Sequence, residues 1–86
     1  MNPQVSIIIS VLDQLAYTKR CLKSIEDTLI NKISYEVLIV DDCSNDQTIE
    51  FLRSLDFPHK VFLNSEKKGF AKNNNFAASE AKGEFL

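Results

Sequence analysis

The stretch Val37–Asp46, VLIVDDCSND, constrains the fold of this chain more than any other. Its first four residues are apolar and mostly β-branched, which is typical of a strand covered on both faces, as in a parallel sheet. Two carboxylates, Asp41 and Asp42, end this apolar run. Since open α/β sheets bind ligands beyond the carboxyl ends of their strands, we expect these acids to lie at a small-molecule site.

A helix is expected directly after the acidic pair. Ser44 and Gln47 have the S-x-x-Q spacing of a capping box, in which both side chains satisfy free backbone donors of the first turn. The predicted helix covers residues 46–55, and Leu52 lies at the centre of its apolar face.

The rest of the chain continues this alternation of strands and helices. Residues 5–12 contain three consecutive isoleucines and predict a central strand, whereas residues 15–30 change to a helical period with Leu22 and Ile25 on one face. The other expected elements are a strand at 35–40, a short strand at 60–63, and a helix at 70–82 closed by Gly83 as its C-cap. Such strand–helix–strand units form right-handed crossovers in a parallel sheet. Residues 84–86 resemble the start of a fourth strand, so we expect the front half of a longer domain.

Composition narrows the class of protein. A chain of 86 residues with 44% hydrophobic and 26% charged residues is expected to form one globular domain. The net charge of −2 gives no basic surface for nucleic acid. Neither a membrane span nor a signal peptide is recognised, so a cytoplasmic location is expected. Cys21, Cys43 and His59 lack the spacing of a metal site; we expect two reduced thiols and a loop histidine.

Two readings of the acidic pair remain open. Asp41 and Asp42 point to opposite sides because they are adjacent in an extended segment, so only one can face a given crevice. There it could accept a hydrogen bond from a uracil or thymine N–H, hold a ribose hydroxyl or bind a cation. Alternatively, both acids stabilise the start of the following helix.

A second candidate site is the segment 64–75, NSEKKGFAKNNN. Gly69 precedes a predicted helix start, and three lysines lie nearby. Free N–H groups at a helix N-terminus bind phosphate, so a diphosphate is a plausible ligand. The alternative is a solvated turn with an asparagine-rich helix face, because one glycine does not make a phosphate-loop or dinucleotide motif.

Three ordered segments, VSIIISVLDQLAYTKRCLKSI, EVLIVDDCSNDQTIEFL and NSEKKGFAKNNNFAASEAKGEFL, resemble the N-terminal nucleotide-binding half of a family 2 glycosyltransferase. The resemblance implies a GT-A fold: a three-layer α/β/α, Rossmann-like parallel sheet with strand order 3-2-1-(4), truncated after residue 86. It makes residues 1–86 the nucleotide-sugar-binding part of that domain.

The resemblance also assigns roles to individual residues. The turn after the first strand, which holds the base, maps onto Ser10, Val11, Leu12 and Asp13. Asp42, the second acid of the DDxS motif, would read a pyrimidine ring, with Asp41 as its supporting acid. The motif at the third helix start maps onto Gly69, Asn74 and Asn75, near the ribose or diphosphate.

This sequence departs from the family pattern at several of these positions. Leu12 replaces a frequent tyrosine that stacks on the base, and Cys43 replaces a frequent glycine. Ser10 and Asp13 replace a frequent proline and asparagine. Asn74 replaces a frequent arginine, and the form GFAxxNN resembles the rhamnosyltransferase-like branch.

The resemblance implies inverting transfer of a sugar from a UDP- or dTDP-sugar to a glycan or lipid-linked acceptor. The family's D-x-D motif, which holds Mn²⁺ or Mg²⁺, would follow the end of this sequence, as would the catalytic base. The full-length enzyme is therefore expected to use such a metal and to act in the cytoplasm or peripherally at the inner membrane face, and the 86 residues alone are expected to be inactive.

Two other classes of function compete with the transferase. One is a non-catalytic scaffold in which the unpaired sheet edge joins copies of the chain. The other is a receiver-like signalling domain, which also has paired acids at strand ends. It is disfavoured because the acids follow the second strand and no later strand-end aspartate and lysine are found.

Overall fold

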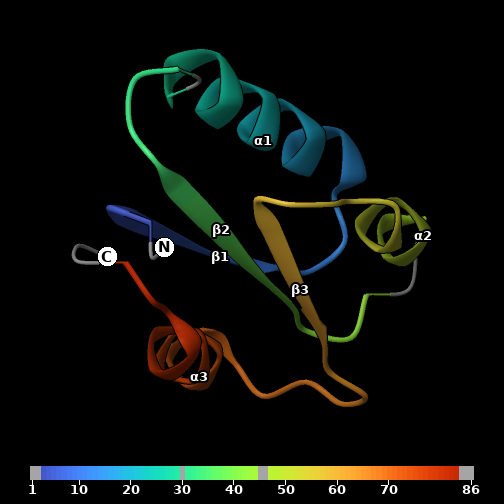
Figure 1. The fold of residues 1–86 in the computed structure, drawn as a ribbon. Helices are drawn as coiled ribbons and strands as arrows, with labels where there is room; N and C mark the ends of the chain where they lie inside the picture. The colour runs from blue at the N-terminus through green and yellow to red at the C-terminus, as the bar shows by residue number, and fades with distance from the viewer. Residues whose placement is uncertain (1–2, 30, 45–46, 84–86) are drawn as a thin grey trace.

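The computed structural model describes residues 3–29, 31–44 and 47–83, in which strands and helices alternate along the chain (Figure 1). In chain order the elements are β1 (Val5–Val11), α1 (Leu15–Leu29), β2 (Tyr35–Asp41), α2 (Thr48–Arg53), β3 (His59–Leu63) and α3 (Phe70–Glu80). Every strand and helix expected within the described ranges is present. The expected fourth strand falls on residues 84–86, outside them.

The three described strands form one parallel sheet with the order β1-β2-β3. The predicted order 3-2-1 is therefore confirmed for these strands. Their register brings the last residues of all three strands together, because Val11 pairs with Asp41 and Asp41 pairs with Leu63. The turns that follow the strands consequently meet at one edge of the sheet.

The central position of β2 explains its apolar sequence. Its two faces bury alternate residues, as expected from the period of a strand. Val37 and Ile39 belong to one hydrophobic cluster with Leu22 of α1 and Leu52 of α2. Leu38 and Val40 form the other cluster with Ala77 of α3.

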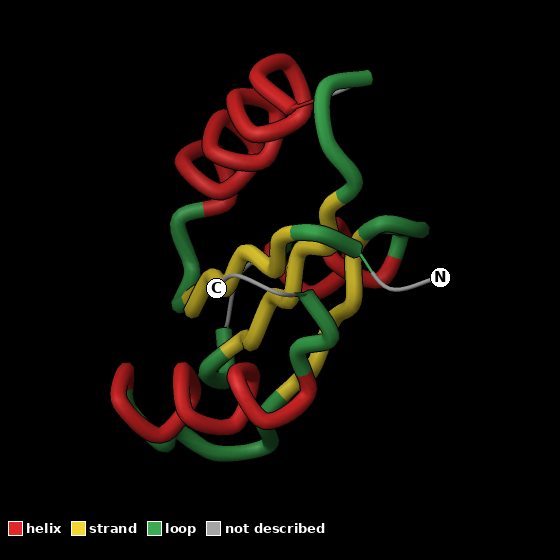
Figure 2. The backbone as a smooth tube through the Cα atoms, turned by 60° about the vertical axis from the view of Figure 1, so that its left-hand side comes forward, coloured by secondary structure: helices red, strands yellow, loops and turns green. Residues whose placement is uncertain are grey.

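The helices accordingly lie in two outer layers. The packing of β2 against α1 and α2 on one face and against α3 on the other gives the three-layer α/β/α arrangement (Figure 2). In α1 the buried residues are Thr18 and Leu22, one helical turn apart, which confirms the predicted amphipathic helix. None of the helices in the described ranges combines the length and apolar character needed to cross a membrane.

Two predicted helix caps are wrong. Gln47 occupies the N-cap position of α2 but makes no side-chain cap hydrogen bond, and the Ser44 hydroxyl binds Asp41 instead. The helix α3 ends at Glu80 with an extended residue at its C-cap, so Gly83 does not close it. In both cases a contact with another part of the molecule replaces the local cap.

The length of α2 and the position of His59 differ from the predictions, whereas the two cysteines agree with them. The helix α2 is shorter than the predicted range 46–55, and residue 46 lies outside the described residues. His59 is the first residue of β3 rather than a loop residue. Cys21 and Cys43 are free and half-buried, as expected.

Candidate nucleotide site

The turns after β1, β2 and β3 build the candidate site at the carboxyl edge of the sheet. Asp41 belongs to its buried frame, since its carboxylate has no exposed surface. This carboxylate accepts hydrogen bonds from the hydroxyl and, at 3.0 Å, the backbone N–H of Ser44. The Ser44 oxygen accepts in turn from the backbone N–H of Asp13 at 2.7 Å. Asp41 is thus turned toward its own turn and ties it to the turn after β1.

The backbone of these two turns is left-handed at several residues. Cys43 has a φ of 69°, and Asp13 and Gln14 have φ values of 55° and 60°. Residues other than glycine rarely adopt this region. The conformation at Cys43 explains why glycine is frequent at this position in the DDxS pattern.

Asp42 faces the layer that contains α3 and is 7% exposed. Its carboxylate accepts the backbone N–H groups of Lys68, at 2.7 Å, and Gly69, at 3.2 Å, and the side-chain amide of Asn64, at 3.3 Å. The Lys68 N–H contributes most to lowering the pKa of Asp42; burial opposes it, and the bonds from Gly69 and Asn64 add to the lowering. The net effect keeps Asp42 ionised and a hydrogen-bond acceptor.

A chain of amides connects Asp42 with the turn after β1. The amide of Asn64 also donates to the side-chain oxygen of Asn73 at 2.8 Å, and the amide of Asn73 donates to the Ser10 hydroxyl at 3.1 Å. Asn73 is 2% exposed. Because buried polar groups are costly without partners, this series of hydrogen bonds fixes the position of Ser10 relative to Asp42.

Asn64 and Asn73 lie within the candidate segment 64–75 but were not singled out as site residues, although the sequence carries a signal for both. Asn64 directly follows β3, so the argument applied to the acids after β2 would have placed it at the same edge. Asn73 lies one helical turn before the buried Ala77, so both face the sheet.

The predicted residues at the start of α3 are only partly brought into this network. Gly69 has a φ of 90° and donates to Asp42. Asn74 is half-buried and Asn75 is exposed. Each successive residue turns about 100° around the helix axis, so neither shares the direction of Asn73. Their roles as ligand contacts remain predictions.

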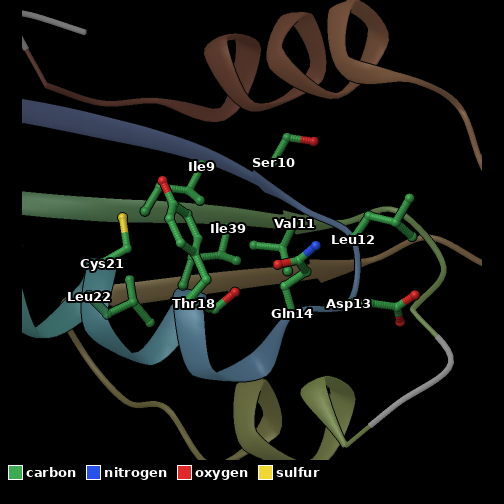
Figure 3. A pocket seen from close by; sticks show the side chains of 11 residues that line it. Ile9, Ser10, Val11, Leu12, Asp13, Gln14, Thr18, Cys21, Leu22 and Ile39 are labelled. Atoms are coloured by element: carbon green, nitrogen blue, oxygen red, sulfur yellow. The ribbon is translucent and has the colours of Figure 1, made fainter.

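A cavity of about 300 Å³ lies between the turn after β1 and the helix α1 (Figure 3). Val11, Leu12 and Asp13 line it, and the Leu12 side chain is 43% exposed. In Figure 3 the Ser10 side chain points away from α1, toward α3. A second hollow, of about 260 Å³, is lined by Asn64, Lys68, Lys72 and Asn73 among others.

The described residues do not offer a divalent metal a set of ligands. Within residues 3–29, 31–44 and 47–83, no three His, Cys, Asp or Glu side chains lie close enough together to hold a metal ion. The two acids of the site are occupied by hydrogen bonds from Ser44 and from the segment 64–69.

Comparison with known proteins agrees with this architecture. The family model described as "Glycosyl transferase family 2" matches residues 6–86. An uncharacterised glycosyltransferase of Haemophilus influenzae is 33% identical over 82 residues, covering 95% of this chain and 27% of that protein. The poly(ribitol-phosphate) β-N-acetylglucosaminyltransferase TarS of Staphylococcus aureus is 30% identical over 86 residues, covering 94% of this chain and 15% of TarS.

A solved structure shares the fold. The mannosyltransferase PcManGT from Pyrobaculum calidifontis, in complex with GDP-Man and Mn²⁺, superimposes with a TM-score of 0.82 at 25% identity. The match covers 98% of this chain and 26% of that chain. The chain thus spans less than a third of the length of each of these proteins, and the expected GT-A type of α/β fold is confirmed.

Proposed function

Because the chain belongs to glycosyl transferase family 2, we propose that its carboxyl sheet edge binds the nucleotide of a UDP- or dTDP-sugar. The sugar would pass, with inversion, to a glycan or lipid-linked acceptor. The form GFAKNNN favours the rhamnosyltransferase-like branch of the family. Since the chain spans about a quarter of its first relatives, the complete reaction is proposed for a longer protein and not for these 86 residues alone.

The observation that carries this proposal is the ionised carboxylate of Asp42 at the sheet edge. A carboxylate accepts the N3–H of uracil or thymine, which is the single ring donor of these bases. The three hydrogen bonds from residues 64–69 use two acceptor positions of Oδ1 and one of Oδ2, and a carboxylate offers about four, so the base N–H can bind the remaining position of Oδ2. The bond from Gly69 to the same oxygen, at 3.2 Å, is the longer of the two backbone bonds and is expected to adjust when the base binds.

Other residues of the edge fit the remaining parts of a nucleotide. The exposed Leu12 side chain can cover one face of the ring, although without aromatic stacking. Lys68 and Lys72 line the hollow beside Asn64, where their positive charge suits a diphosphate. Ser10 through Asp13 would then contact the base and ribose from the first turn.

A divalent cation, Mn²⁺ or Mg²⁺, is proposed for the longer enzyme because the similar mannosyltransferase structure contains Mn²⁺. When bound, such a cation offsets the negative charge of the leaving diphosphate. No ligand for it is assigned to the described residues, and no step is derived through it. A cytoplasmic site of action, at or near the inner membrane face, is part of the same proposal.

The decisive experiment is a two-dimensional NMR titration of the chain with UDP, dTDP and GDP, each with and without Mg²⁺. We expect UDP and dTDP to shift the resonances of residues 10–13, Asp42 and Gly69, and Mg²⁺ to change little. GDP is the critical alternative, since guanine also presents N–H donors that a carboxylate can accept. Preferential binding of GDP would refute the pyrimidine assignment, and no response to any nucleotide would refute donor binding by this chain.

A matched pair of variants makes the test specific. Asp42→Asn removes the charge and one acceptor at the site, and it should abolish the nucleotide-dependent shifts. Asp27→Asn is the control, because Asp27 is exposed on α1 and forms only a surface pair with Lys23. Equal binding by both variants would contradict the role of Asp42.

Self-association is the competing proposal. Within the described residues β1 and β3 each pair only with β2, which leaves each strand one edge for another chain. Size-exclusion chromatography over a range of concentrations tests it. A monomer that binds nucleotide would exclude the scaffold function.

A further inference from the structure

A second buried carboxylate lies at the opposite end of β2. Glu36 is 3% exposed and binds three parts of the molecule outside its own strand. It accepts hydrogen bonds from the Ser6 hydroxyl of β1 and from the backbone N–H of Lys82, both at 2.6 Å. Its other oxygen pairs with the ammonium of Lys60 on β3 at 3.0 Å. One side chain thus joins all three described strands to the segment that follows α3.

Gly83 completes this cluster. Its N–H donates to the Ser6 oxygen at 2.8 Å. A Cβ atom at Gly83 would lie 2.5 Å from that oxygen, 2.6 Å from the Ser6 nitrogen and 2.7 Å from the carbonyl carbon of Val5. Backbone atoms of β1 cannot yield to such a contact without moving the strand. The absence of a side chain at residue 83 therefore allows the end of α3 to rest against β1.

The two carboxylate clusters hold the same helix from opposite ends. Glu36 and Asp42 are six residues apart, so they lie on the same side of β2 as Leu38 and Val40 and about 20 Å from each other. Leu38 and Val40 pack against Ala77 in the middle of α3. Asp42 receives the N–H groups just before α3, and Glu36 receives the N–H just after it.

We propose that Glu36 is a positioning residue for the nucleotide site. Glu36 holds the C-terminal end of α3 against the sheet and thereby fixes the position of the helix along the direction of β2. That position determines whether Lys68 and Gly69 reach Asp42, and whether Asn73 reaches Ser10. This proposal rests on the proposed nucleotide binding, but its structural part can be tested without any nucleotide.

The physical basis is the directionality of hydrogen bonds compared with apolar contacts. Leu38, Val40 and Ala77 would tolerate a small slide of α3, because dispersion and burial depend weakly on direction. Hydrogen bonds weaken steeply with distance and angle, and a slide of about 1 Å would break those to Asp42. A helix transmits such a displacement along its length because its own backbone bonds keep it rigid.

The test compares Glu36→Gln with Lys60→Met. Glu36→Gln weakens the connection to α3, because the Ser6 hydroxyl and the Lys82 N–H both donate to one oxygen, and a neutral amide oxygen accepts more weakly than an ionised carboxylate oxygen. Lys60→Met removes the ion pair but leaves the bonds from Ser6 and Lys82, so it changes β3 and not α3. We expect Glu36→Gln to shift the backbone resonances of Lys68 and Gly69 and the side-chain resonance of Asn73, and Lys60→Met to leave them unchanged.

Nucleotide affinity provides the second measurement. UDP or dTDP, whichever binds the unsubstituted chain more tightly, should bind Glu36→Gln about three- to ten-fold more weakly, as expected for one disturbed hydrogen bond. Lys60→Met should bind it as the unsubstituted chain does. Unshifted resonances in a folded Glu36→Gln chain would overturn the proposal, even if that chain were less stable. Shifted resonances with no nucleotide binding by any variant would uphold the positioning of α3 and refute the proposed function.

Ser6→Ala covers the case in which Glu36→Gln does not fold. It removes the hydroxyl that joins Glu36 to Gly83 while retaining the charge. The same resonances should shift, by a smaller amount. Their constancy in folded Ser6→Ala would also overturn the proposal.

Discussion

Acid should weaken this fold in a way that can be traced to Glu36. Burial raises the pKa of Glu36, but the hydrogen bonds from Ser6 and Lys82 and the ammonium of Lys60 lower it by more, to about 2 from its ordinary 4.5. A carboxylate whose pKa is lower in the folded state stabilises the fold fully above its unfolded pKa. This stabilisation is lost as the pH falls from about 4.5 toward 2.

The magnitude follows from the difference between the two pKa values. It corresponds to at most about 3 kcal/mol of unfolding free energy. The Lys60 side chain is 42% exposed, so solvent screens part of its contribution, and we expect about 2 kcal/mol. For a chain of this size, that is a large part of the total stability.

Urea unfolding followed by circular dichroism at pH 7, 4.5, 3 and 2.5 measures this effect. The unfolding free energy of the unsubstituted chain should exceed that of Glu36→Gln at pH 7, and this difference should narrow by about 1.5 kcal/mol between pH 7 and pH 2.5, because a folded pKa of about 2 leaves the rest of the effect below that range. Acids whose surroundings are the same in both chains cancel in this difference, whereas Asp42 adds to the narrowing to the extent that Glu36→Gln disturbs its bonds from Lys68 and Gly69. Glu26→Gln, at an exposed position of α1, is the control and should show a constant gap. A gap for Glu36→Gln that stays constant down to pH 2.5 would refute the reasoning.

Two further substitutions test the packing around the sheet. Leu38 has no exposed surface, so Leu38→Ala should lower the unfolding free energy by about 2–5 kcal/mol. Leu12→Ala, at an exposed side chain, should lower it by less than about 1 kcal/mol. Equal losses of unfolding free energy in urea would contradict the assigned core. Gly83→Ala should cost about 1–3 kcal/mol or more because its Cβ would overlap β1. Gly69→Ala meets no atom within 4 Å, but the φ of 90° and ψ of 160° at this residue lie in a region essentially restricted to glycine, so it should cost about 1–3 kcal/mol from backbone strain alone. A Gly83→Ala chain that is as stable as the unsubstituted chain in thermal melts would refute the close approach at Gly83.

Local sequence patterns were sufficient to predict the elements and their layers. The unbroken apolar run before Asp41 predicted a strand buried on both faces, and β2 has that position. The helical period from Leu15 predicted α1 and its buried face. These predictions succeeded because burial of a strand or helix face depends on residue spacing within the element itself.

The caps could not be predicted in the same way. Ser44 and Gln47 have the spacing of a capping box, yet the Ser44 hydroxyl binds Asp41 and its oxygen accepts from Asp13. Gly83 lies where a helix-closing glycine is expected, yet it is used for contact with Ser6. A local motif predicts what a residue can do, whereas the neighbouring strand determines which partner it meets.

The sequence by itself determined the order of strands and helices, the burial of β2 and the presence of Asp42 at a strand end. Only the tertiary structure decided which groups each acid meets. Those partners are remote in the chain: Lys68 is 26 residues from Asp42, Lys82 is 46 residues from Glu36, and Gly83 is 77 residues from Ser6. The physical reason is that a hydrogen bond needs two groups within about 3 Å, and across such separations only the packing of α3 on the sheet brings them that close.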